Sequence, residues 1–401
     1  MKRFISYLMV LSIILAGAAA LADTAEAAPA EDTLKLSFSE VDRLVRRGNL
    51  TIRNNEITVQ NIDELLGSDD MLAVMINNLN QLYSLQHQTE LVRGQILATT
   101  TSLGDPVRDG VIMTLTNDIA SLGTSIGQVS SQIDQLFTAP RASRDKTVQQ
   151  LNNVNKQIVW GAESLFMGYH ALARQLDQSK ETLETLNRNI NVLERRLLLG
   201  QITERTLKTL INNRIQLEQG IKSMENELMN MKGQINLLIG RSHDAPLEIN
   251  SIPAAERDFL ESIDRTKDLR SATRSNYLIN IALVDVEEQV RKSGNSARSQ
   301  EAIARNNYDA EVRAVELRYE NLIKAITDRG TQLTLEEAQL SLVQQALAET
   351  RRKHDLGRVS RIELDQAESD VLLQTIRVKT AEAELFGAIR RYEWLIRGLS
   401  V

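Results

Sequence analysis

A short motif occurs twice in this chain, once in each half. Leu199-Gly200-Gln201-Ile202-Thr203 recurs as Leu356-Gly357-Arg358-Val359-Ser360, and each copy follows a pair of basic residues. A looser echo links Arg47-Gly48-Asn49 to Arg274-Ser275-Asn276. An internal repeat of this size is typical of one supersecondary unit present in two copies. We therefore expect two long helical hairpins that turn at Gly200 and Gly357, because glycine readily adopts the left-handed conformation that ends a helix.

The composition favours long helices over a compact core built on sheets. Aromatic residues make up only 4% of the 401 residues, and the chain has 5 Pro. Helices with narrow apolar seams suit this balance, since they bury little area per residue. In one segment the apolar residues alternate at spacings of three and four, which is the seam of a coiled coil. Its members are Ile112, Leu115, Ile119, Leu122, Ile126, Val129, Ile133 and Leu136. The predicted fold class is all-α with coiled-coil packing and little or no β.

These patterns divide the chain into a leader and two repeats. We expect residues 34–240 to form the first helical-hairpin repeat, residues 241–253 a linker and residues 254–401 the second repeat. The first repeat carries an extra coiled-coil segment, about 70–140, that contains the strict seam. The second repeat is expected to begin with one helix from about 254 to 292.

Several function classes find no support in the residues. The net charge of −6 comes without a basic patch that could follow a phosphate backbone, so no nucleic-acid partner is expected. The four His are scattered and Cys is absent, which gives no metal centre. No phosphate loop and no nucleophile–base pair appears, so we expect no cofactor and no enzymatic activity.

The N-terminus has the pattern of an export signal. Lys2-Arg3 precede an apolar run from Phe4 to Ala20, and small residues follow at Ala20-Leu21-Ala22. We expect residues 1–22 to be a signal peptide and residues 23–33 a disordered leader. An uncleaved N-terminal anchor is the alternative, because the run approaches the length of a membrane span. Either way the chain is expected to work outside the cytoplasm, in the periplasm or cell envelope.

The duplicated order of a short helix, a long helix, a glycine turn and a return helix resembles the TolC family of outer-membrane efflux proteins. The residues that carry the resemblance are Leu36-Ser37, Glu40 and Asn49 in the first half, and the stretch Arg352–Glu368 in the second. The likeness covers about two thirds of the chain.

The resemblance implies a homotrimer whose six hairpins form a tapering α-helical tunnel. Its tips would be Gly200, Gln201, Ile202 and Thr203 with Gly357, Arg358, Val359 and Ser360, and they would dock a periplasmic adaptor (membrane fusion) protein. Family members carry acidic residues just after the second turn that line a closed aperture, and Glu363 matches that position, with Asp365 nearby. The implied function is that of a duct for passive transport of exported small molecules or proteins.

The sequence departs from the family in one respect. Family members carry transmembrane strands in each half, and a membrane strand needs about ten residues of alternating polarity. Neither about 70–140 nor Ser293–Ser296 shows that pattern, so we expect a tunnel without these strands, with an outer-membrane location only if such a pore exists.

Two other functions remain open. One is an extracytoplasmic coiled-coil scaffold without transport, in which the glycine turns are only helix caps and Glu363 and Asp365 are solvated helix charges. The other is a helical pore-forming toxin, although no second apolar run near 18 residues follows Ala22.

Overall fold

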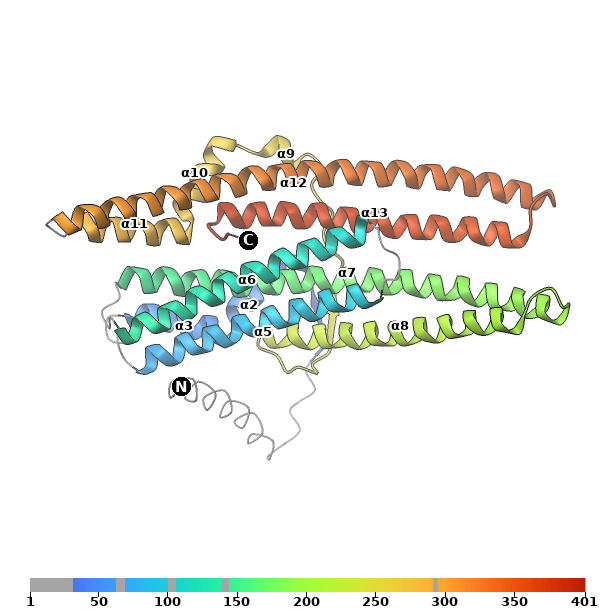
Figure 1. Ribbon diagram of the computed structural model, residues 1–401, viewed down its shortest axis with the longest axis horizontal. Helices are drawn as coiled ribbons and strands as arrows, with labels where there is room; N and C mark the ends of the chain where they lie inside the picture. The colour runs from blue at the N-terminus through green and yellow to red at the C-terminus, as the bar shows by residue number, and fades with distance from the viewer. Residues whose placement is uncertain (1–31, 63–68, 100–105, 139–143, 291–294, 401) are drawn as a thin grey trace, which may run out of the picture.

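The computed structural model describes residues 32–62, 69–99, 106–138, 144–290 and 295–400, and the structure of these residues is nearly all helical (Figure 1). The predicted all-α fold with little or no β is confirmed. The predicted signal peptide, residues 1–22, and most of the leader lie outside the described residues. In chain order the elements are β1 (Leu34–Leu36), α2 (Phe38–Gly48), α3 (Leu50–Gln60), α5 (Asp69–Thr99), α6 (Pro106–Thr138), α7 (Arg144–Leu198), α8 (Glu204–Leu238), β2 (Leu247–Ile249), α9 (Phe259–Ser262), α10 (Arg265–Ser275), α11 (Tyr277–Val290), α12 (Asn295–Asp355) and α13 (Arg361–Ile396).

Two long hairpins dominate the molecule. Helices α7 and α8 form the first, and α12 and α13 form the second (Figure 1). Helix α7 has 55 residues and α12 has 61, which at ~1.5 Å per residue makes them about 80 and about 90 Å long. Helix α13 packs on α7 as well as on α12. The four helices therefore lie side by side in the order α8, α7, α13, α12.

A short helix continues the line of each return helix. Gly240, just past α8, lies against the backbone of Gly48, where α2 ends and α3 is about to begin. Gly398, just past α13, lies against the backbone of Ser275, directly before α11. Neither glycine has room for a Cβ atom, and both have positive φ, 78° and 87°. Each long helix thus packs along a companion made of two helices stacked end to end.

The weaker sequence repeat, which contains Asn49 and Asn276, lies at the two junctions where a short helix meets the end of a return helix. Asn49 caps α3 by accepting the backbone N–H of Ile52 at 3.2 Å, and its Nδ2 donates to the carbonyl oxygen of Leu238. Asn276 accepts the N–H of Ile279 at 3.2 Å, and its Nδ2 donates to Ser400 Oγ at 2.9 Å. One residue type therefore both starts the short helix and ties it to the end of the return helix.

The beginnings of the two repeats differ from expectation. Leu34–Leu36 is a strand, paired in parallel with Leu247–Ile249 of the expected linker, and the first helix begins after a capping box of Ser37 and Glu40. The single helix expected over about 254–292 is wrong. Asp264 caps a new helix by accepting the N–H of Lys267, and Asn276 starts another, so α9, α10 and α11 replace it.

The extra segment forms an antiparallel helical pair, α5 and α6, that lies over α7 (Figure 1). Of the strict seam, Leu115, Leu122, Ile126 and Val129 are buried. Ile112 and Ile119 are half-buried, and the side chains of Ile133 and Leu136 lie outside the described ones.

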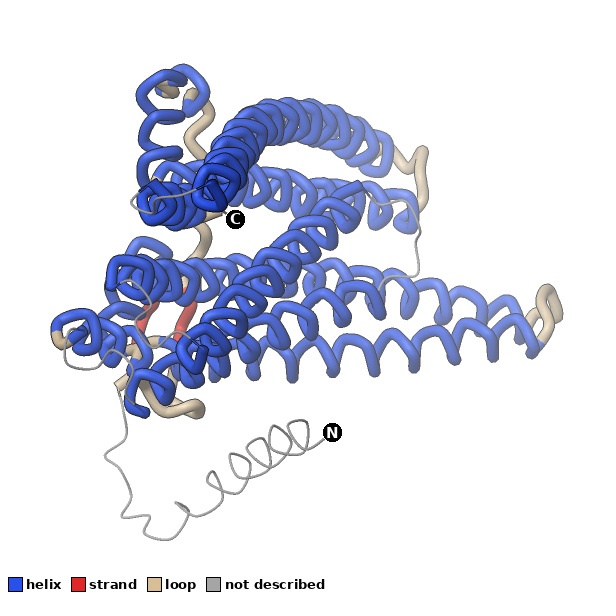
Figure 2. Tube along the Cα trace, turned by 60° about the vertical axis from the view of Figure 1, so that its left-hand side comes forward, coloured by secondary structure: helices blue, strands red, loops and turns tan. Residues whose placement is uncertain are grey.

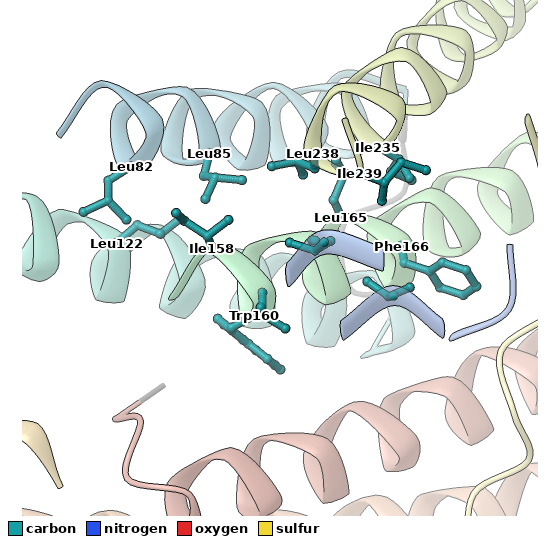
Figure 3. Close-up of a cluster of buried hydrophobic side chains, with 14 of the residues drawn as sticks. Leu82, Leu85, Leu122, Ile158, Trp160, Leu165, Phe166, Ile235, Leu238 and Ile239 are labelled. Carbon is teal, nitrogen blue, oxygen red and sulfur yellow. The ribbon is translucent and has the colours of Figure 1, made fainter. Parts of the chain in front are cut away.

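The first hydrophobic core lies around α7, the helix that most other elements contact. Figure 3 shows Leu82 and Leu85 of α5 and Ile235 of α8 above α7, while Trp160 points to the opposite side, toward α13. Trp160 packs edge to face with Trp394 at 6.5 Å between ring centroids. Both tryptophans are packing residues; Trp394 lies near the end of α13, whereas Trp160 lies well inside α7. Within the described ranges, no helix is both long and apolar enough to cross a membrane.

Candidate docking site at the hairpin tips

The two tip turns have the same backbone geometry. Gly200 and Gly357 each have φ of 69°. Gly200 N–H donates to the carbonyl of Leu197 and Gln201 N–H to that of Arg196, both at 2.9 Å. The second tip repeats this pattern at 2.8 Å, with donors Gly357 and Arg358 and acceptors His354 and Lys353. These paired bonds are the Schellman motif, which closes a helix through a left-handed residue.

The return helices also begin alike. Thr203 Oγ1 accepts the N–H of Thr206 and caps α8, and Ser360 Oγ accepts the N–H of Glu363 and caps α13. No other atom lies within 4 Å of where a Cβ would stand on Gly200 or Gly357. In both views the two turns lie toward the same end of the molecule (Figures 1 and 2). The structure therefore brings the two sequence motifs into equivalent, open positions.

The most exposed apolar side chains of the two tips are not among the predicted contact residues, although Leu199 and Leu356 belong to the repeated motif. Leu198 is 88% exposed, Leu199 71%, Leu356 68% and Ile362 59%. By contrast, Ile202 and Val359, the predicted contact residues, are half-buried, while Gln201 and Arg358 are exposed. The signal that could have found these side chains is an apolar residue within a few positions of the glycine turn, at the end of one long helix or the start of the next.

Glu363 and Asp365, the predicted aperture residues, both interact within their own helix. The backbone N–H of Ser360 donates to Glu363 Oε2 at 2.7 Å, and the Ser360 hydroxyl donates to the same oxygen at 3.0 Å. The backbone bond, followed by the hydroxyl, holds the pKa of Glu363 below its ordinary value. Asp365 pairs with Arg361 at 2.8 Å. Both carboxylates lie in the first turns after the tip.

Between the tips and the core, a polar link joins the two hairpins. Arg188 of α7 donates to Ser369 Oγ of α13 at 3.1 Å and pairs with Glu181 at 3.4 Å. The Ser369 hydroxyl also donates to Glu181. Nothing in the sequence pattern indicated this link, because its members lie on different hairpins.

Within the core around α7, a buried carboxylate of α7 bonds to side chains of α13 and so joins the two hairpins. Glu163 of α7, 1% exposed, accepts from Arg390 at 2.6 and 2.8 Å and from Trp394 Nε1 at 2.7 Å. Asp118 of α6 pairs with Arg391 at 3.1 Å, and burial raises the pKa of Asp118 despite that partner. In the part of the chain that the structure describes, no group of His, Asp and Glu converges as a metal site would require.

The fold is similar to that of a protein of solved structure, CusC. No family model matches the chain. It is similar to the structure of CusC, described as showing "conformational changes accompanying folding and transmembrane channel formation", at 15% identity over 80% of this chain and 96% of that one, with a TM-score of 0.50. The outer membrane protein VceC from Vibrio cholerae matches at 10% identity over 90% of this chain and 96% of that one, with a TM-score of 0.46.

At this identity the similarity to CusC establishes the fold. The resemblance to the TolC-like outer membrane efflux channels is therefore confirmed as a shared architecture. CusC is described as forming a transmembrane channel, and what this chain shares with it is the fold.

Proposed function

We propose that this chain is an exported, TolC-like duct component that assembles as a homotrimer and docks an adaptor protein with its two hairpin tips. The observation that carries the proposal is the duplicated tip. Two turns from separate halves share φ, hydrogen bonds and exposed leucines, and they lie toward one end of a rod. At both turns several large apolar side chains lie exposed close together, as an apolar contact surface requires.

The chemistry of the tips indicates what they contact. Burying one leucine side chain contributes roughly 1.5–3 kcal/mol, so Leu198, Leu199, Leu356 and Ile362 together offer an apolar anchor. Arg358 and Gln201 are exposed beside them and can hydrogen-bond to the partner at the edge of this apolar contact. A partner that presents apolar grooves between helices, as a coiled-coil adaptor does, fits this surface.

In a trimer, Glu363 and Asp365 would be repeated three times in the first turns of α13. Since its lowered pKa keeps Glu363 charged at neutral pH, a ring of these carboxylates would place negative charge close behind the tips. Such a ring supports an aperture for passive passage of exported small molecules or proteins, and we place the assembled duct in the cell envelope.

The test uses paired tip variants and a matched control. Leu199→Asp and Leu356→Asp place a charge in the proposed contact, and Leu50→Asp does the same at a 69% exposed leucine that starts α3. Pull-downs with a periplasmic adaptor protein from the same organism should lose capture for the tip variants and retain it for Leu50→Asp, with equal melting temperatures for all three. Capture at the wild-type level by both tip variants would support the scaffold function instead.

A further inference from the structure

The α5–α6 pair is held firmly on the first hairpin. Leu85 lies over Gly161 of α7, where an added Cβ would be 2.8 Å from its Cδ1, and Val92 lies one heptad further on, near Gly168. At the sides, Gln88 bonds to Gln234 of α8 at 2.6 Å, and Asp118 pairs with Arg391 of α13. The surface that the pair turns outward is therefore fixed in place.

Each of the two helices carries an exposed stripe at heptad spacing. On α5 the stripe consists of Ala73, Asn77, Asn80, Ser84, His87, Leu91 and Gly94. On α6 it consists of Met113, Asn117, Ala120, Thr124 and Gly127. Alternate spacings of four and three residues keep one line of side chains facing one neighbour along a helix, as in a coiled coil.

Neither stripe carries an Asp, Glu, Lys or Arg. Four of the 31 residues of α5 and four of the 33 of α6 are of these types, against 25% of the whole chain. A chain with a net charge of −6 repels its own copies. An uncharged surface is where two copies can approach without placing like charges together.

Residues of the two stripes lie at the same levels along the antiparallel α5–α6 pair. Gln86 of α5 donates to the carbonyl of Ile119 and lies beside Gly123, so its height corresponds to about residue 121 of the antiparallel α6. Counting in opposite directions from this level pairs Gly94 with Met113, His87 with Ala120 and Asn80 with Gly127. At each level a larger side chain on one helix meets a small residue on the other.

We infer that the α5 stripe of one copy packs against the α6 stripe of the next copy around the ring. The inference rests on the proposed homotrimer. A rotation about an axis parallel to the α5–α6 pair leaves every residue at its own height along that pair, so with such an axis the levels within one pair also hold between copies. A groove of about 250 Å³ beside the α6 stripe, lined by Ala120, Thr124 and Arg318 among others, leaves room for the incoming side chains.

This contact supplements other contacts between copies. The α5 stripe from Ala73 to Gly94 is about 31 Å long at ~1.5 Å per residue. At about 10 Å wide it covers on the order of 300 Å², below the ~800 Å² per partner of a standard interface. The long hairpins must therefore supply the rest of the trimer contact, and the stripes set its register.

The chain contains no cysteine, so introduced thiols report on contacts directly. A disulfide needs Cβ atoms about 3.5–4.5 Å apart. The double variant His87→Cys/Ala120→Cys joins positions at one height, and Ala73→Cys/Ala120→Cys is the control, since residue 73 lies two heptads, about 21 Å, away. Under mild oxidation the first should form covalent dimers and trimers on a non-reducing gel, and the control should remain single chains.

The mass of the unmodified protein in solution separates the stripe contact from the proposed homotrimer. A trimer mass with no interchain disulfide in the matched variant would overturn the stripe contact and leave the proposed duct standing. A single-chain mass would overturn both. Cross-linking of the control to the same extent as the matched variant would also overturn the register.

Discussion

The two halves of this chain are alike at both ends of their hairpins and differ most in one place. Each has a Schellman turn at its tip and a glycine seated against the backbone at its junction. Between companion helix and long helix, however, the first half carries α5 and α6, whereas only residues 291–294 separate α11 from α12. The repeat therefore preserves the parts that define a hairpin and tolerates a large addition where the companion helix meets the long one.

The difference changes the environment of equivalent positions. Glu163 and Trp160 of α7 are buried under α13 and the parts packed around it, but the corresponding residues of α12, Glu320 and Leu317, are exposed. In a single chain, α7 lies in the middle of the helix layer and α12 at its edge. Substitutions at equivalent sequence positions should therefore change the free energy of unfolding by different amounts.

The largest expected effect is at Glu163. Glu163→Ala leaves the largely buried Arg390 with only the half-buried Glu393 as an acidic partner and removes the acceptor of Trp394, which costs about 3–5 kcal/mol. Glu320→Ala, the matched change in the second half, should alter the free energy of unfolding by less than about 0.5 kcal/mol. Urea unfolding of both variants measures the difference. Equal losses would contradict the assignment of α7 to the middle of the layer.

The junction glycines are the next strongest test, because here the halves should agree. Gly240→Ala and Gly398→Ala combine a strained left-handed alanine, about 1–2 kcal/mol, with a Cβ that meets the backbone of Gly48 or Ser275, about 1–3 kcal/mol. Thermal melts should show similar losses for the two variants. A loss confined to one of them would mean that only one companion helix is stacked.

A change in the added pair tests whether it belongs to the first hairpin. Leu85→Ala empties the space over Gly161 and should cost roughly 2–3 kcal/mol, as buried leucine truncations do. Leu91→Ala, on the exposed stripe of the same helix, should cost less than about 0.5 kcal/mol. If global unfolding in urea is unchanged by Leu85→Ala, the pair is an independent attachment.

The tip glycines should tolerate substitution better than the junction glycines. Gly200→Ala and Gly357→Ala meet no atom within 4 Å, so only the left-handed strain of about 1–2 kcal/mol applies. Differential scanning calorimetry of all four alanine variants ranks them directly. A tip variant that melts below its junction partner would show that the tip is buried in the isolated protein.

The last expected effect concerns pH. His170 Nε2 donates to the carbonyl of Asn250 at 2.8 Å, and burial, outweighing that bond, lowers its pKa to about 4. The unfolded chain takes up a proton near pH 6.5 and the folded chain does not, so stability falls as pH drops from about 6.5 toward 4. His170→Gln should weaken this dependence, measured by urea unfolding at pH 7 and pH 5. The equivalent position in α12 is Thr327, which does not titrate.

The sequence predicted what depends on local pattern and missed what depends on contacts between distant helices. Repeated glycines and heptad spacing predicted the hairpins and the extra helical pair, because helix ends and seams are local properties. The Arg188–Ser369 link and the Glu163 cluster unite residues of different hairpins, and no spacing encodes them. The break at Asp264 was missed although residues 264–268 carry no apolar side chain, because the cap side chain decides where the new helix starts.

The predicted tip residues stay predictions as far as docking is concerned. The turn itself was predicted correctly at Gly200 and Gly357, whose positive φ is the property that the glycine pattern implied. The side chains were harder, since Ile202 and Val359 are half-buried and the leucines one turn earlier are exposed. Exposure at a helix end depends on how far the neighbouring helix extends, which only the structure defines.

The central claim is that equivalent hairpins from two halves assemble into one tube with all tips at the same end. Electron cryo-microscopy of the purified mature protein tests it most directly. We expect three copies of the 45.0 kDa chain, less any cleaved leader, around a hollow axis, with the six Gly200 and Gly357 turns at one end. Isolated single chains, or an assembly with tips at both ends, would contradict it.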